Sequence, residues 1–217
     1  MIDVRTTRHQ MVEQQVRAWS VLDLKVLEVM DRVAREQFVP AAFRDVAYAD
    51  MNVPLGHGQT MLAPKVEGRI LQSLAIQPQD RVLEVGTGSG YFAACLAQLA
   101  RSVRSIEIVP ELADTARANL ERSGVRSVLV ETGDAMTTTG EELFEVIALT
   151  GSLPVYDPRF ERALVVGGRL FVTVGTGPTM EARKVARTGR RDWTRKSLFE
   201  TRIEPLVNAP RPPAFVF

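Results

Sequence analysis

The chain has 217 residues, and its 27 lysines and arginines nearly balance its 26 acidic residues, which leaves a formal net charge of +1. This balance excludes a strong overall attraction to nucleic acid or to an anionic membrane. With 45% hydrophobic and 24% charged residues, the chain has enough apolar side chains for a core, so we expect neither a disordered nor a fibrous protein.

No stretch approaches the ~18 consecutive apolar residues of a membrane span, and the N-terminus carries charges where a signal peptide has its apolar segment. We therefore expect a cytoplasmic protein with no membrane partner. One cysteine, Cys95, and two histidines, His9 and His57, are too few for an internal disulfide or a zinc cluster. We expect no metal, and the apolar helical surroundings of Cys95 predict that it packs in the core.

The residues before position 80 are predicted to be mostly helical, because apolar side chains recur there at intervals of three and four. Thr6 or Thr7 can cap the first helix and Asp23 the second, while Pro64 suits the first turn of another. Prolines and glycines interrupt residues 45–60 too often for a helix. That segment is expected to be an ordered loop or a short pair of strands.

From residue 81 onward, short runs of β-branched residues alternate with helical segments, which is typical of βαβ units on a parallel sheet. The predicted strands cover residues 81–85, 103–108, 127–131, 144–149 and 169–174, with helices at 91–99 and 111–122. Residues 182–188 and 194–203 are predicted to form an antiparallel hairpin. The expected fold class is α/β: a Rossmann-like, doubly wound, mostly parallel sheet with an N-terminal helical extension and a C-terminal hairpin.

We expect one structural domain with three parts. They are the helical extension at residues 1–78, which contributes to the substrate site, the sheet-containing core at 79–207, and a proline-rich tail at 208–217. The tail is predicted either to fray or to dock through its terminal aromatic residues.

A glycine-rich turn with the sequence LEVGTGSGY, residues 83–91, joins a predicted buried strand to a helix. Its glycines permit positive φ angles and let a ligand approach the backbone closely. A dinucleotide-binding turn reads G-x-G-x-x-G, whereas here the third glycine comes one place earlier and Tyr91 stands in its expected position. Glu84 would be badly placed beside a pyrophosphate but could accept hydrogen bonds from the ammonium of an amino-acid moiety. Both departures favour S-adenosyl-L-methionine over NAD as the cofactor.

Two further acids follow predicted strands. Glu107 ends the second strand, 21 residues after Gly86, where a carboxylate can bind both ribose hydroxyls. Asp134 follows the third strand and could meet the adenine amino group, although an acid at a strand end is more often a helix cap. Together these features predict the nucleoside-binding edge of a class I methyltransferase. The predicted cofactor site comprises Glu84, Gly86, Thr87, Gly88, Ser89, Gly90, Tyr91, Glu107, Ile108, Gly133, Asp134, Ala135 and Thr150.

Six motifs add information about the substrate. They are MVEQQ at 11–15, REQFVP at 35–40, AYAD at 47–50, PLGHGQT at 54–60, RVLEVGTGSGY at 81–91 and PELA at 110–113. Together they resemble the protein-L-isoaspartate O-methyltransferase family, roughly over residues 9–176. The resemblance implies transfer of a methyl group from S-adenosyl-L-methionine to the α-carboxylate of an isoaspartyl residue in a damaged protein, leaving S-adenosyl-L-homocysteine.

The motif at 54–60 is the most specific of the six, and the resemblance implies that it forms a substrate loop. The loop residues are Pro54, Gly56, His57, Gly58 and Gln59. A carboxylate with a pKa of about 4 is already ionised at pH 7, so methylating it requires no general base. His57 is therefore predicted to shape the loop rather than to act as an acid or base.

The chain departs from the family directly after this loop. The family carries Ile-Ser-x-Pro there, and the resemblance implies that the serine hydroxyl helps to bind the substrate, whereas this chain carries Leu62 in place of the serine. Loss of such a hydroxyl removes a hydrogen bond worth about 1 kcal/mol net. The catalytic candidates are therefore Leu62, at the substituted position, with Thr60 and Lys65, either of which could hold a carboxylate instead. Lys65 could equally be a solvated helix residue.

Other interpretations stay open at this point. The same cofactor could serve a small-molecule acceptor, in a pocket made more apolar by Met61 and Leu62, or the chain could bind the cofactor without catalysis. Gly151 and Ser152 can border the cleft, and no Asn/Asp-Pro-Pro-Tyr/Phe motif follows their strand, which counts against methylation of a nucleobase. The basic residues at 183–196 include little aromatic interleaving, so we expect a solvated sheet edge and no nucleic-acid partner.

Overall fold

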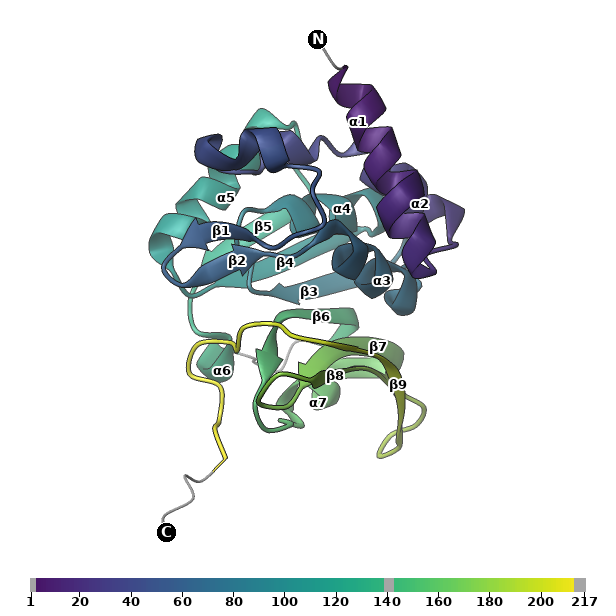
Figure 1. The fold of residues 1–217 in the computed structure, drawn as a ribbon. Coiled ribbons are helices and arrows are strands. Elements are labelled where there is room, and N and C mark those ends of the chain that lie inside the picture. Colours follow the sequence, from purple (N-terminus) through teal and green to yellow (C-terminus); the bar gives the residue numbers. More distant parts are fainter. Residues whose placement is uncertain (1–2, 139–142, 213–217) are drawn as a thin grey trace.

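The computed structural model describes residues 3–138 and 143–212, and its centre is a seven-stranded sheet (Figure 1). The strands are β3 (Arg81–Val85), β4 (Ser102–Glu107), β5 (Val128–Thr132), β6 (Phe144–Leu153), β7 (Leu164–Val174), β8 (Met180–Arg187) and β9 (Trp193–Thr201). Strands β3 to β7 pair in parallel, whereas β8 and β9 are antiparallel to their neighbours. The prediction of an α/β fold with a mostly parallel sheet and a C-terminal hairpin is confirmed.

The order of the strands locates the place where a ligand can bind. Across the sheet the order is β5-β4-β3-β6-β7-β8-β9, so the chain builds outward from β3 to β5 and then crosses to β6 on the other side. In open α/β sheets, ligands bind beyond the carboxyl ends of the strands where the order reverses. The ends of β3, β4 and β6 therefore define the expected site.

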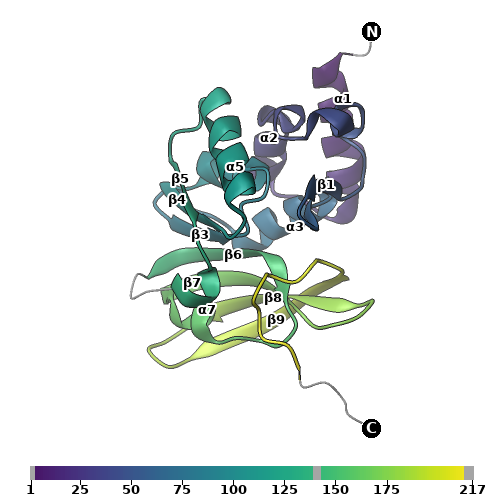
Figure 2. The same cartoon turned by 90° about the vertical axis from the view of Figure 1, so that its left-hand side faces the viewer.

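Each face of the sheet is covered by its own hydrophobic core, because successive side chains of a strand point to opposite faces. Val82 and Phe171 belong to the core on one face, which includes α3 (Pro64–Leu74), α4 (Tyr91–Leu99) and α5 (Pro110–Arg122). Leu83 and Leu170 belong to the other core, which includes residues of α6 (Ala135–Thr138) and α7 (Arg159–Arg162). Cys95 is fully buried in the first core, as predicted. Figure 2 shows α5 and the N-terminal helices grouped on one side of the sheet.

The N-terminal extension forms a helical layer. Its elements are α1 (Val4–Met11), a π-helical turn (Val12–Val16), a 3-10 turn (Arg17–Trp19), α2 (Leu24–Arg32) and two more 3-10 turns (Arg35–Gln37 and Ala41–Val46). The Asp23 carboxylate caps α2 by accepting from the Lys25 amide, as predicted. The predicted cap of α1 is wrong, because the helix begins before Thr6 and Thr7 and is capped by Asp3.

The segment at 45–60 contains the short strand pair that was one of its two predicted forms. Strand β1 (Val53–Gly56) pairs antiparallel with β2 (Gln59–Met61) in a separate two-stranded sheet. Gly56, His57 and Gly58 have φ angles of 89°, 53° and 70° in the turn between them. Glycine adopts these angles without strain, which explains its presence on both sides of His57. Strand β2 then leads into α3, whose first residue is Pro64, as predicted.

Two strands are longer than the apolar pattern indicates. Strand β6 continues from Leu149 to Leu153 through polar and glycine residues, because Ser152 pairs with neighbours on both sides. Its amide donates to the Glu204 carbonyl, and its own carbonyl accepts from the Leu206 amide, both at 2.9 Å. Strand β7 begins at Leu164 rather than at residue 169. It includes Gly167 and Gly168, which directly precede the predicted strand.

The segment after β9 returns to the sheet. Ile203 is buried in one core and Ala209 in the other, so residues 203–209 are held at both ends. The terminal aromatic residues that could dock the tail lie outside the described residues. Of the helices in residues 3–138 and 143–212, none combines the length and the apolar character that crossing a bilayer requires.

Candidate active site

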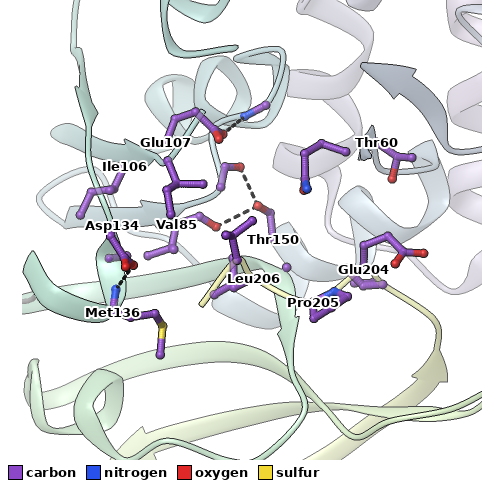
Figure 3. A pocket seen from close by; sticks show the side chains of 18 of the residues that line it. Thr60, Val85, Ile106, Glu107, Asp134, Met136, Thr150, Glu204, Pro205 and Leu206 are labelled. Carbon is purple, nitrogen blue, oxygen red and sulfur yellow. Dashed lines mark hydrogen bonds between the residues drawn. The ribbon is translucent and has the colours of Figure 1, made fainter. Parts of the chain in front are cut away.

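One cleft lies at the carboxyl edge of the sheet, where residues from the ends of β3, β4 and β6 meet the loop after β5 (Figure 3). Further walls come from the N-terminal layer and from the segment after β9. The lining residues are Gln59, Thr60, Leu62, Val85, Gly86, Gly88, Ile106, Glu107, Ile108, Gly133, Asp134, Ala135, Met136, Thr150, Gly151 and residues 203–207. Most of the residues that the sequence nominated therefore lie around a single cleft.

The glycine-rich turn has a backbone conformation that favours glycine. Gly86, Gly88 and Gly90 have φ angles of 94°, 55° and 85°, in the left-handed region that strains other residues. A Cβ atom on Gly86 would lie 2.4 Å from Thr150 Oγ1, so a side chain there would collide with β6. The Thr150 hydroxyl donates to the carbonyl oxygens of Val85 and Gly86, at 2.9 Å and 2.6 Å. The turn thus presents bare backbone to the cleft.

The Glu107 carboxylate is fixed by backbone amides on two sides. One oxygen accepts from the Gly88 amide at 2.8 Å, and the other accepts from the Val109 amide at 3.0 Å. The residue is only 4% exposed, yet it lines the cleft. Each carboxylate oxygen keeps a further lone pair, so a bound ligand can still donate to it. The two backbone amides therefore fix the orientation of the carboxylate.

Asp134 has two kinds of contact. Its Oδ1 accepts from the Met136 amide at 2.8 Å, near the start of α6, and its Oδ2 accepts from the Asn208 side chain at 2.9 Å. The sequence left open whether Asp134 stabilises a helix terminus or faces a ligand. In the structure the same carboxylate contacts the first turn of α6 and also lines the cleft.

The position of Glu84 differs from the expectation that its carboxylate faces the ligand. Its side chain is fully buried and does not line the cleft, so it has no direct path to the ammonium of a ligand there. The Ser105 hydroxyl donates to it, and Thr87 Oγ1 lies 2.6 Å from Ser105 Oγ. Burial raises the pKa of Glu84 to about 8, the Ser105 hydrogen bond opposes that rise, and the Glu107 charge adds to it. The hydrogen-bonded side chains of Glu84, Ser105 and Thr87 thus connect the ends of β3 and β4 with the glycine turn.

A second, narrower space, which we call the side cavity, separates the glycine turn from the β1–β2 hairpin. It is lined by Leu55, Thr60, Met61, Leu62, Glu67, Gly86, Thr87, Gly88, Ser89, Phe92 and Thr150. Gly90 and Tyr91, which were also nominated for the cofactor, line neither space. A Cβ atom on Gly90 would face Ala116 of α5, and the Tyr91 ring is buried, with its centre 5.7 Å from that of Phe38.

The three catalytic candidates do not all line the same space. Thr60 and Leu62 line both the cleft and the side cavity. Lys65 lines neither, because its ammonium donates to the Asp50 carboxylate at 2.6 Å and lies 4.0 Å from the centre of the Trp19 ring. The hypothesis that Lys65 holds a substrate carboxylate is therefore not supported by its position. The alternative, that Lys65 is simply a solvated helix residue, is incomplete as well, because its ammonium is paired with the Asp50 carboxylate.

The nominated substrate loop reaches the cleft through one residue, Gln59. Gly58 and Gln59 also line a shallow groove whose other side is formed by residues 204–209 and Arg211. Pro54, Gly56 and His57 line neither the cleft nor this groove. The loop therefore contributes to the cleft with its C-terminal end.

Sequence reasoning missed the segment after β9, which supplies five consecutive lining residues, 203–207. A Cβ atom on Gly151 would lie 2.6 Å from Leu206 Cδ2, so the glycine lets this segment approach β6 closely. Of the two residues that could border the cleft, Gly151 lines it, whereas Ser152 is buried and its hydroxyl donates to the Ile203 carbonyl at 2.8 Å. None of the six sequence motifs extends to these residues.

Three of the basic residues of the hairpin have partners within it or on neighbouring elements. Arg183 pairs with Glu181, and Arg195 pairs with Glu161 at 2.7 Å. Arg187 donates to backbone carbonyls, including that of Arg190 at 2.9 Å. None of these residues lines the cleft.

Comparison with known proteins relates this arrangement to one family. The family model described as Protein-L-isoaspartate(D-aspartate) O-methyltransferase (PCMT) matches residues 6–210. Protein-L-isoaspartate O-methyltransferase 2 of Marinobacter nauticus is 39% identical over 207 residues, which cover 94% of each chain. A protein-L-isoaspartate O-methyltransferase of Methanoculleus marisnigri is 42% identical over 190 residues, which cover 86% of each chain.

Solved structures share the fold. A Plasmodium falciparum protein, described as a protein-L-isoaspartate O-methyltransferase in complex with S-adenosyl-L-homocysteine, superposes with a TM-score of 0.81 at 20% identity. The match covers 92% of this chain and 97% of that one. Another protein-L-isoaspartate O-methyltransferase gives a TM-score of 0.79 at 20% identity, covering 91% of this chain and 65% of that one.

The buried Glu84 predicts a specific dependence of stability on pH. Its folded pKa of about 8 lies above the ordinary 4.5, so the unfolded chain releases this proton at lower pH than the folded chain does. The contribution of Glu84 to the free energy of unfolding is then fully present below about pH 4.5 and is lost as the pH rises toward 8. Glu84→Gln, which cannot titrate, should gain about 1–4 kcal/mol relative to the unsubstituted chain between pH 5 and pH 8.

Denaturant unfolding of both proteins at several pH values measures this difference. The other titrating groups are common to the two chains, so the effects of those that do not interact with Glu84 cancel in the comparison. Parallel curves across the whole range would contradict the assignment of a raised pKa to Glu84.

Proposed function

The chain belongs to the protein-L-isoaspartate(D-aspartate) O-methyltransferase family, and from this premise we propose that it methylates the carboxylate of isoaspartyl residues in damaged proteins. S-Adenosyl-L-methionine supplies the methyl group as part of a sulfonium, and S-adenosyl-L-homocysteine is its product. The observation that carries the proposal is the meeting, in one cleft, of the glycine turn, two strand-end carboxylates and the Thr60–Leu62 segment.

The described residues fit this cofactor. Gly86 and Gly88 line the cleft without side chains, so their backbone offers the close approach that a nucleoside with an amino-acid tail requires. Glu107, already oriented by two amides, would accept from the ribose hydroxyls. Asp134 would accept from the adenine amino group. The remaining cofactor residues in this proposal are Ile108, Gly133, Ala135 and Thr150, which line the same cleft.

The other nominated residues would act indirectly. Glu84 and Thr87 fix the turn to β4 through their hydrogen bonds with the Ser105 hydroxyl. Ser89 accepts from the Asn119 side chain at 2.9 Å through its carbonyl, which ties the turn to α5. Gly90 and Tyr91 begin α4 and set its direction. We therefore assign these residues to support of the cofactor loop rather than to contact with the cofactor.

The acceptor chemistry asks little of the protein beyond placement. A carboxylate is ionised at neutral pH, so the chain must bind it near the cofactor, align it with the methyl group and exclude water. On the acceptor side the cleft offers the Thr60 hydroxyl and the Gln59 amide as hydrogen-bonding groups. Leu62 adds an apolar wall. In this proposal Thr60 is the hydroxyl that orients the carboxylate.

The direct test is methyl transfer from labelled S-adenosyl-L-methionine to an isoaspartyl peptide and to the same peptide with an ordinary aspartyl residue. We expect label to enter only the isoaspartyl peptide. Equal labelling of both peptides, or no labelling of either, would contradict the proposal. Binding of S-adenosyl-L-homocysteine without transfer to either peptide would point to a different acceptor or to a non-catalytic module.

Removal of the Glu107 carboxylate should weaken cofactor binding. Glu107→Ala deletes charge-assisted hydrogen bonds worth about 1.5–3 kcal/mol, so the Kd for S-adenosyl-L-homocysteine should rise about 10- to 100-fold in calorimetry. Glu131→Ala is a matched control, since that acid is paired with Arg104 on a neighbouring strand and does not line the cleft. Unchanged affinity in Glu107→Ala would overturn the cofactor assignment.

Restoring a hydroxyl at Leu62 should improve acceptor binding. Leu62→Ser and Leu62→Ala both remove an almost completely buried isobutyl group, so their losses of packing are similar. Only serine can donate to a substrate carboxylate, and a hydrogen bond of about 1 kcal/mol corresponds to roughly a fivefold higher kcat/KM. Steady-state kinetics with the isoaspartyl peptide compares the two variants. Identical kcat/KM values would show that position 62 does not contact the acceptor carboxylate.

A further inference from the structure

Arg35 carries a fully buried guanidinium in the N-terminal layer. Its nitrogens donate to three separate segments: to the Ala47 carbonyl at 2.9 Å, to the Leu62 carbonyl at 2.7 Å and to the Glu67 carboxylate. The guanidinium also lies 4.8 Å from the centre of the Tyr91 ring. Because Tyr91 directly follows the glycine turn, one side chain connects the acceptor side of the cleft with the helix that begins at this turn.

Glu67, the partner of Arg35, lies in α3 and is 2% exposed. It lines the side cavity together with Thr60 and Leu62 from the hairpin segment and with Gly86 and Gly88 from the glycine turn. Burial raises the pKa of Glu67 to about 7, and the Arg35 charge and hydrogen bond oppose that rise. The buried ion pair therefore stands where the acceptor side of the cleft meets the glycine turn.

Stability alone is a weak explanation for this pair. The cost of removing two charges from water offsets much of their attraction, so a buried ion pair often stabilises a fold less than apolar side chains would. A guanidinium does, however, fix the relative positions of several acceptors, because its donors have a rigid planar arrangement. Here the Leu62 carbonyl is held by Arg35 while the Leu62 side chain lines the cleft. The orientation of Leu62 thus follows from the position of Arg35.

We propose that Arg35 and Glu67 are positioning residues for the methyl acceptor. The pair holds the segment Thr60–Leu62 at a fixed separation from the glycine turn, and so sets where an acceptor carboxylate lies relative to the bound cofactor. This inference rests on the proposed function, because it takes the acceptor to bind beside Thr60 and Leu62. It assigns no contact with the cofactor to either residue.

The variant Arg35→Lys tests the inference. Lysine keeps the charge but has a single nitrogen, which cannot reach Ala47, Leu62 and Glu67 in the geometry of a guanidinium. We expect kcat/KM for an isoaspartyl peptide to fall about 10- to 100-fold, since small displacements in a reacting pair have effects of this size. The Kd for S-adenosyl-L-homocysteine should change less than about twofold, because its proposed ligands stay in place.

A matched control is available in the same molecule. Arg169 also donates to two carbonyls, those of Leu74 and Ala75, and to a buried carboxylate, that of Asp80. Asp80 lies just before β3, at the end of the strand opposite the cleft. Arg169→Lys should therefore lower the free energy of unfolding, as Arg35→Lys does, without lowering kcat/KM for the peptide.

Hydrogen exchange gives a readout that needs no acceptor. In the full chain with S-adenosyl-L-homocysteine bound, Arg35→Lys should speed exchange of the amides at residues 59–63, whereas Arg169→Lys should not. If Arg35→Lys does not fold, Glu67→Gln, which keeps the shape of the side chain, is measured in its place with the same expectation.

The outcomes separate this inference from the proposed function. An unsubstituted chain that methylates no isoaspartyl peptide contradicts the proposed function, and exchange at residues 59–63 still decides whether the pair fixes this segment. An active chain in which Arg35→Lys and Arg169→Lys have the same kcat/KM and the same exchange at 59–63 overturns the inference. A parallel loss of cofactor affinity and of kcat/KM for the peptide in Arg35→Lys also overturns it, because the role would then be general support of the fold.

Discussion

The hydrogen bond from the Gly88 amide to the Glu107 carboxylate is the contact on which the rest of the site depends. It can form because β3 and β4 pair in parallel, which brings their carboxyl ends side by side, and the Gly86 amide extends this pairing by donating to Ile106. With the turn fixed to β4, β6 reaches it through Thr150, and α4 begins in the direction that brings Tyr91 against Arg35. Hydrogen bonds within the protein therefore position three strand ends and the N-terminal layer relative to one another, which lowers the ordering cost of binding a ligand.

The near-zero net charge of the chain constrains how an acceptor is selected. A net charge of +1 supplies no long-range attraction that could select an acceptor, so selection must come from short-range contacts. The two sides of the cleft differ in this respect. In the proposed assignment, the side for the cofactor has oriented carboxylates, whereas the side for the acceptor has the Thr60 hydroxyl and an apolar side chain at Leu62. An acceptor would thus be recognised by shape, burial and few hydrogen bonds, in a segment whose position is set by the buried Arg35.

The sequence predicted those features that follow from local patterns. Alternating strands and helices gave the fold class, and the positive φ angles of the glycine turn and the strand-end acids follow from local requirements of backbone and register. Three features depended on distant partners and were missed or misjudged. Glu84 faces Ser105 rather than the cleft, Lys65 is paired with Asp50, and Ile203–Val207 forms a wall because it bridges to Ser152. No periodicity encodes such contacts, because each joins residues far apart in the chain.

The central claim is that the carboxyl edge of the sheet binds the nucleoside of the cofactor, with Glu107 and Asp134 as its anchors. A crystal structure of this chain with S-adenosyl-L-homocysteine tests it most directly. The account predicts the ribose hydroxyls within hydrogen-bonding distance of Glu107, the adenine amino group at Asp134, and Leu62 facing the sulfur end of the ligand. A ligand bound outside this cleft, or bound within it without contact to Glu107, would contradict the account.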